Sequence, residues 1–119
     1  MIDIINIIAA VLTIGFGAFG FVAPRYTLNV LDLAPTQSNM GLSEARASVG
    51  GLFVALGLVA ILVQADWLYC AIGIAYLGAA AGRVVSLILD APPRNKLLVY
   101  FGIEAGLGLW LVCANLSAF

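Results

Sequence analysis

The sequence predicts an all-α fold: a polytopic membrane protein with a four-transmembrane-helix bundle. The first observation is composition, since 64% of the 119 residues are hydrophobic and 9% are charged, whereas a soluble domain is about half apolar and a quarter charged. A soluble fold this small could not bury so much apolar surface. The second observation is that apolar runs long enough to cross a bilayer recur four times. We expect residues 1–119 to form one domain, with helices at about residues 4–23, 44–65, 67–89 and 97–117.

The first helix is expected over an uncharged run of about 20 residues, Ile4–Ala23. A secretory signal begins with positive charge and has a shorter apolar region, whereas Asp3 is the only early charge here. We therefore expect this segment to be retained as a membrane span. Polar and small residues recur along it at helical spacing and are expected to face inward: Asn6, Ala10, Thr13, Gly17 and Gly20.

The connection over residues 24–43 fits either a plain loop or a short interfacial helix around Tyr26–Leu33. The helix is favoured because its apolar side chains can lie on the membrane while Arg25 and Asp32 stay in water. The apolar side chains in question are Leu28, Val30 and Leu31.

Local signals mark the ends of the remaining helices. Ser43 is expected to cap the second helix, with Glu44 in its first turn. A tight turn near Gln64–Asp66 leads to the third helix, which Pro92 and Pro93 terminate because proline lacks the backbone donor. Small residues are expected to let the second and fourth helices approach their neighbours: Gly50, Gly51, Gly57, and the GxxxG pair Gly102 and Gly106.

The basic residues predict the orientation in the membrane. Arg25, Arg94 and Lys96 lie in the first and third connections, with Arg46 at the edge of the first. The positive-inside rule therefore places both connections in the cytoplasm and both termini outside, as in a bacterial inner membrane protein. Aromatic residues fit an outer and an inner interfacial belt: Trp67 and Tyr69 in one, Tyr26 and Tyr100 in the other.

Two charges fall inside the spans. Arg83 and Glu104 each lie about seven residues, roughly 10 Å, from the cytoplasmic end of the third and fourth helices. An arginine cannot deprotonate, and a charge in the bilayer centre costs about 2.5–3.5 kcal/mol, so we expect these two side chains to pair. A buried polar cluster on the cytoplasmic side is predicted from Glu44, Arg46, Arg83, Ser86, Asp90 and Glu104.

The cluster has two interpretations. Ion pairs of Arg83 with Glu104, and of Arg46 with Asp90 or Glu44, can clamp the helices and fix their register without any ligand. Alternatively, the cluster lines a pocket for a small molecule, an anion or a lipid headgroup, used in transport or sensing. Membrane lipid is an expected partner in both cases. A further alternative is an accessory or scaffold subunit of a larger membrane complex. A homo-oligomer is a separate expected form of association.

Other classes are disfavoured by composition. The chain has no histidine and two cysteines, Cys70 and Cys113, which leaves no ligand set for zinc, haem or an iron–sulfur cluster. We expect no metal, no cofactor and no catalytic site. The net charge of −1 without a basic tract disfavours nucleic acid. Two buried thiols are favoured over a disulfide.

Three stretches resemble a known family. "GLSEARASVGGLFVALG", "GRVVSLILDAPP" and "FGIEAGLGLW" are similar to domain of unknown function 4345, a group of small bacterial membrane proteins. The resemblance implies about four spans and carries over no activity; by architecture alone the chain is also similar to compact four-helix families of the DoxX type. The positions that match the family pattern are Glu44, Arg46, Gly50, Gly51, Gly82, Arg83, Ser86, Asp90, Pro93 and Glu104.

Overall fold

The computed structural model describes residues 2–116, which include four helices long and apolar enough to cross a membrane. The candidate spans are Ile4–Val22, Met40–Val63, Asp66–Leu89 and Arg94–Ala114. The predicted all-α fold with four long apolar helices is confirmed, and the protein is an integral membrane protein by these spans.

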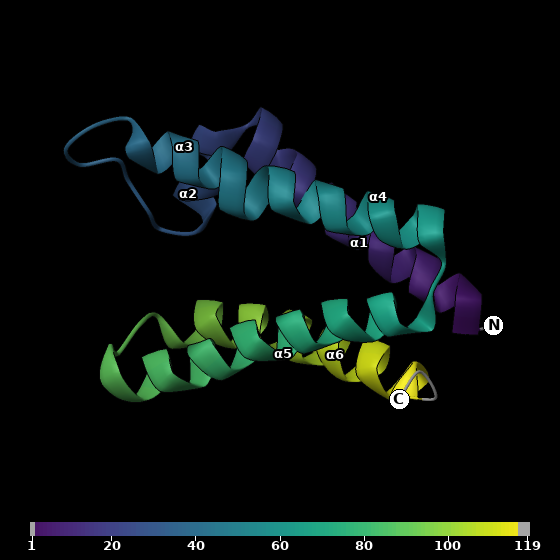
Figure 1. Cartoon of the computed structure of the whole chain (residues 1–119). Coiled ribbons are helices and arrows are strands. Elements are labelled where there is room, and N and C mark those ends of the chain that lie inside the picture. The colour runs from purple at the N-terminus through teal and green to yellow at the C-terminus, as the bar shows by residue number, and fades with distance from the viewer. Residues whose placement is uncertain (1, 117–119) are drawn as a thin grey trace. The chain divides into compact units, whose positions relative to one another are not determined.

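The helices divide into two compact units (Figure 1). The N-terminal unit, residues 3–63, holds α1 (Ile2–Val22), α2 (Pro24–Val30), α3 (Met40–Arg46), the π-helical turn η1 (Ala47–Gly51) and α4 (Leu52–Val63). The C-terminal unit, which begins at residue 64, holds α5 (Asp66–Leu89) and α6 (Arg94–Ala114).

In the N-terminal unit, α1 packs closely on η1 and α4. A Cβ added to Gly17 would lie 2.7 Å from the Gly50 carbonyl oxygen, and one added to Gly20 would collide with the backbone of Val49. Backbones can approach this closely only because both faces lack side chains at these positions. The predicted inward stripe of α1 is confirmed, since its members are all buried: Asn6, Ala10, Thr13, Gly17 and Gly20.

The second span begins earlier than the sequence predicted. Asn39 is the N-cap of α3, and the Ser38 hydroxyl accepts the Met40 amide at 3.2 Å. The prediction that Ser43 caps this helix with Glu44 in its first turn is therefore wrong, because both residues lie inside α3. The observed N-cap, Asn39, lies four residues upstream of the predicted cap, and its side chain makes no capping hydrogen bond.

The span is not α-helical throughout. In η1 the Leu52 amide reaches the Ala47 carbonyl, five residues back, which widens the turn. The turn ends in the pair Gly50 and Gly51. A single π-helical turn within an α-helix is a local bulge, and here it lies where α1 approaches most closely.

A short helix in this connection is confirmed as α2, which begins at Pro24, a residue suited to the first helical turn, and ends at Val30 instead of near Leu33. That it lies at the membrane interface stays a prediction. Its Thr27 hydroxyl donates to the Ala23 carbonyl at 2.9 Å. One detail differs: Leu28 is buried, so it packs inside the protein instead of lying on the membrane. Val30 is exposed, as expected.

In the C-terminal unit, α5 and α6 lie side by side and run antiparallel (Figure 1). They meet at Gly73 and Gly108, where an added Cβ on either residue would lie 3.0 Å from the carbonyl oxygen of the other. Within the C-terminal unit the predicted GxxxG pair makes no helix contact, because nothing lies within 4 Å of a Cβ added at Gly102 or Gly106. These two glycines are on a face of α6 that points away from α5.

Both predicted chain reversals are confirmed. Gln64, with a φ of 54°, makes the tight turn between α4 and α5. After α5, the Asp90 amide bonds the Ser86 carbonyl at 2.8 Å, and Ala91 takes a φ of 46° before the two prolines.

Candidate functional site

The charged pair predicted inside the spans forms between α5 and α6. Arg83 Nε donates to Glu104 Oε1 at 2.8 Å, and Arg83 Nη2 lies 3.5 Å from Glu104 Oε2. Arg83 lies six residues before the end of α5, roughly 9 Å along its axis, and Glu104 lies near the middle of α6. The guanidinium therefore engages the carboxylate along one edge, with one short bond and one long one.

An aromatic ring completes the group. The Arg83 Cζ atom lies 5.3 Å from the centroid of the Tyr100 ring, a cation–π distance. Tyr100 precedes Glu104 by four residues, so both lie on the same face of α6. Tyr100 was predicted to lie in an interfacial belt. The four-residue spacing to Glu104 was the signal that it lies beside the charged pair.

The pair is half-buried, and the prediction of a buried salt bridge is wrong in this respect. The side chain of Arg83 is 36% exposed and that of Glu104 is 18% exposed. Gly82, beside Arg83 on α5, has no side chain to cover the guanidinium, and nothing lies within 4 Å of a Cβ placed there. Among the described residues, Arg83 Nη1 has no hydrogen-bond partner.

The other two predicted members on α5 lie toward its end. Ser86 is half-buried and follows Arg83 by three residues, on the same side of the helix. Asp90 is the C-cap and is exposed. Within the C-terminal unit the Asp90 side chain is therefore uncovered, and its place in a shared buried cluster stays a prediction.

The two predicted members on α3 have other partners. Arg46 is exposed, and its Nη1 donates to the Phe21 carbonyl at 2.7 Å, in the last turn of α1. The carbonyls of a last helical turn lack intrahelical donors, so Arg46 caps α1 instead of pairing with a carboxylate of α3. Glu44, also exposed, accepts the Ser48 hydroxyl at 3.1 Å. That Glu44 and Arg46 converge with the α5–α6 pair stays a prediction.

The aromatic and cysteine residues of the C-terminal unit differ in how far they are exposed. Trp67 is exposed, as an interfacial residue should be, whereas Tyr69 is buried and cannot belong to a lipid-facing belt. The two thiols are not paired in a disulfide: Cys70 is buried and Cys113 is exposed, which corrects the expectation that both are buried. Within residues 2–116, no group of three potential metal ligands comes together.

Comparisons with known proteins give one match. The family model described as domain of unknown function (DUF4345) matches residues 1–115, nearly the whole chain. No curated protein and no solved structure gives a significant match.

Proposed function

Because this chain belongs to the DUF4345 family, a family of unknown function, we propose its function from the charged pair: the protein binds a monovalent organic anion at Arg83, and Glu104 takes up a proton as the anion binds. The observation that carries the proposal is the half-exposed guanidinium inside a membrane span, held by its Nε edge with Nη1 unpartnered in the described chain.

Arg83 offers the chemistry of an anion site. Its planar fork presents several N–H groups, and carboxylates accept two of them side by side. The ring of Tyr100 supports one part of the guanidinium while a third of the side chain stays open. Ionisable residues inside spans are costly and mark binding sites or proton paths as a rule.

Charge balance requires that one proton binds to the site together with each anion. Arg83 and Glu104 together are neutral, so an added anion would leave one uncompensated negative charge inside the membrane. Such a charge is unfavourable by several kcal/mol in an apolar medium. A proton taken from water by the displaced Glu104 carboxylate restores neutrality, since the site then holds one guanidinium, one anion and one neutral acid.

The surroundings favour an anion with an apolar body. Val84 and Ile103 follow or precede the charged residues directly, and both are exposed apolar side chains within the spans. A fatty carboxylate can lay its chain along such residues while its head reaches Arg83. A small hydrated anion would have to lose its water without that compensation.

The topology that goes with this function follows the basic residues. Arg25 lies in α2, after the first span, and Arg94 and Lys96 lie in the first turn of α6, beside the connection between α5 and α6. By the positive-inside rule these connections face the cytoplasm, with both termini outside, in a bacterial inner membrane. The proton and the anion would then enter from the cytoplasmic side.

Decanoate binding to the purified protein in detergent micelles tests the proposal, with decanol as the uncharged analogue. We expect decanoate to bind more tightly than decanol, with one proton taken up per anion in weakly buffered solution. The dissociation constant should then fall about tenfold for each pH unit lowered, because one proton binds with each anion.

Three variants separate an anion site from a structural clamp. Arg83→Gln should abolish the preference for decanoate over decanol. Glu104→Gln should still bind decanoate, without proton uptake and without pH dependence, because the neutral amide replaces the protonated acid. Arg94→Gln, which removes an exposed cation at the start of α6, is the matched control and should behave as the unaltered protein. If Glu104→Gln loses stability and binds no decanoate, the pair is a clamp.

A second candidate function is that of a subunit in a larger membrane assembly. Four glycines have nothing else of the C-terminal unit within 4 Å of an added Cβ: Gly78, Gly82, Gly102 and Gly106. Small residues at a helix surface allow another transmembrane helix to approach closely. Cysteine cross-linking at these positions in native membranes would yield adducts with a second copy or with a larger partner, and a protein that stays monomeric would exclude this function.

A further inference from the structure

A hollow of about 400 Å³ lies in the N-terminal unit, between α2, the connection that follows it and α3. It belongs to a different unit from the charged pair of α5 and α6 and was not predicted from the sequence. Its lining combines polar and apolar residues. Arg25, Tyr26 and Asn29 supply the polar groups, and Leu28, Leu33 and Leu42 supply much of the apolar surface.

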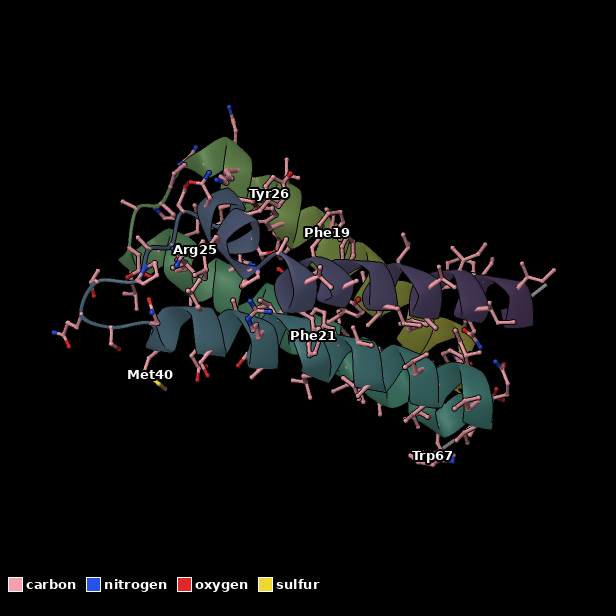
Figure 2. All side chains as sticks on the ribbon, turned by 90° about the horizontal axis from the view of Figure 1, so that it is seen from above. Phe19, Phe21, Arg25, Tyr26, Met40 and Trp67 are labelled. Atoms are coloured by element: carbon pink, nitrogen blue, oxygen red, sulfur yellow. The ribbon has the colours of Figure 1, made fainter. Side chains whose placement is uncertain are left out.

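The polar side chains that line this hollow have no hydrogen-bond or ion-pair partner in the described part of the chain. Arg25 and Asn29 are one helical turn apart on α2, so their side chains lie on the same face. Within residues 2–116, the side chains of Arg25, Tyr26 and Asn29 make no hydrogen bond or ion pair. The Tyr26 ring lies 6.1 Å from the Phe19 ring, and Figure 2 shows the two side by side where α1 meets α2.

The place of the hollow in the chain fits the level of lipid headgroups. The first span ends at Val22, and Arg25 follows within one turn. The headgroup region begins where the hydrocarbon core ends, and aromatic residues such as Tyr26 concentrate at that level. Because Arg25 follows the end of the span so closely, its donors would lie at about the depth of lipid phosphates.

We infer that this hollow binds one anionic glycerophospholipid, with Arg25 and Asn29 on the headgroup phosphate and the apolar wall against the glycerol and upper acyl chains. Arginine pairs with phosphate through two parallel N–H bonds. The volume of the hollow is within the range of small-molecule sites, about 300–1,000 Å³. No carboxylate lines the hollow, so nothing there repels a phosphate. The apolar half of the lining favours a lipid over free phosphate.

Native mass spectrometry of the full chain in detergent tests the inference with dioctanoyl phosphatidylglycerol as the probe. Two fragments of the probe distinguish the sources of binding: dioctanoylglycerol lacks the phosphate, and glycerol 3-phosphate lacks the acyl chains. We expect the phospholipid to bind at least ten times more tightly than either fragment. Equal binding of dioctanoylglycerol would make this a general detergent-like contact, and equal binding of glycerol 3-phosphate would make it a phosphate site; each result overturns the inference.

Variants locate the binding. Arg25→Gln should weaken phosphatidylglycerol binding about tenfold, the loss expected for one charge-assisted contact. Ala34→Trp fills the hollow from an exposed position of its lining and should block the lipid with Arg25 still present. Arg94→Gln removes an exposed arginine outside the hollow and should leave phosphatidylglycerol binding unchanged. Equal losses in Arg25→Gln and Arg94→Gln, or full binding by Ala34→Trp, would overturn the site.

Discussion

The contact between α1 and the second span makes a sharp prediction about one glycine. A methyl group added at Gly20 would collide with the carbonyl oxygen of Val49 and lie 2.6 Å from its carbonyl carbon. Ordinary contact begins near 3.4 Å, so the two backbones would have to separate by at least roughly 0.8 Å. Because the obstacles are backbone atoms, no side-chain rotation can relieve the clash. Overpacking of this kind costs about 1–3 kcal/mol, and we expect Gly20→Ala to fall at the upper end.

Gly15, on the same helix, provides the matched control. Nothing lies within 4 Å of a Cβ at Gly15, so Gly15→Ala should gain helix propensity of about 1 kcal/mol without a clash. Gly20→Ala gains the same propensity but loses packing, which leaves it about 3 kcal/mol less stable than Gly15→Ala. Steric-trapping measurements of unfolding in micelles would give both values. Equal stability of the two variants would refute the packing of α1 described here.

Further predictions concern the C-terminal unit. Gly108→Ala should destabilise the α5–α6 pair by about 1 kcal/mol in the same assay, whereas Gly106→Ala, in the open GxxxG, should not, despite the motif. Ala91→Gly should stabilise the protein by about 0.5–1 kcal/mol, because Ala91 has a φ of 46° that glycine adopts without strain. An unchanged stability would show that alanine is not strained in this turn. A maleimide should label Cys113 in micelles far faster than Cys70, which is buried, and equal rates would contradict the packing of α5.

Much of the fold was predictable because length and hydrophobicity alone define a membrane span. The inward stripe of α1 was also predictable, because polar residues in a membrane span need hydrogen-bond partners and small residues allow another helix to pack closely. The start of α3 was not, because the region after residue 34 offers Ser38, Asn39 and Ser43 as alternative caps. Local sequence does not decide which of several residues favoured at the N-cap begins the helix.

Close helix contacts were predicted less well than helices. The GxxxG motif pointed to Gly102 and Gly106, but α5 meets α6 at Gly73 and Gly108, which form no motif. A glycine marks a contact only when the partner helix offers a small residue at the same level. That pairing depends on the register between helices, which a single helix sequence does not contain.

The pairing of Arg83 with Glu104 was predictable for a different reason, since it follows from energetics and not from register alone. A permanent cation in a span must find a carboxylate, and few carboxylates are present. Its degree of burial was not predictable, because it depends on neighbours such as Gly82 that leave the guanidinium partly uncovered. The partner of Arg46 was missed because backbone carbonyls at a helix end are invisible in a search for opposite charges.

The two proposed anion sites differ in one property that can be measured. Arg83 already has a carboxylate partner, so an anion can bind there without net charge only if Glu104 is protonated. Arg25 has no carboxylate partner in the described chain and lies beyond the end of the first span, where water screens charge. Phosphatidylglycerol carries one negative charge throughout pH 6–8, so its binding to the hollow should be independent of pH over that range. Over the same range, decanoate binding should weaken about tenfold for each unit by which the pH rises, because one proton is released with each anion that dissociates. If both ligands share one pH profile, then charge balance does not distinguish the sites, and the proton-uptake role assigned to Glu104 is wrong.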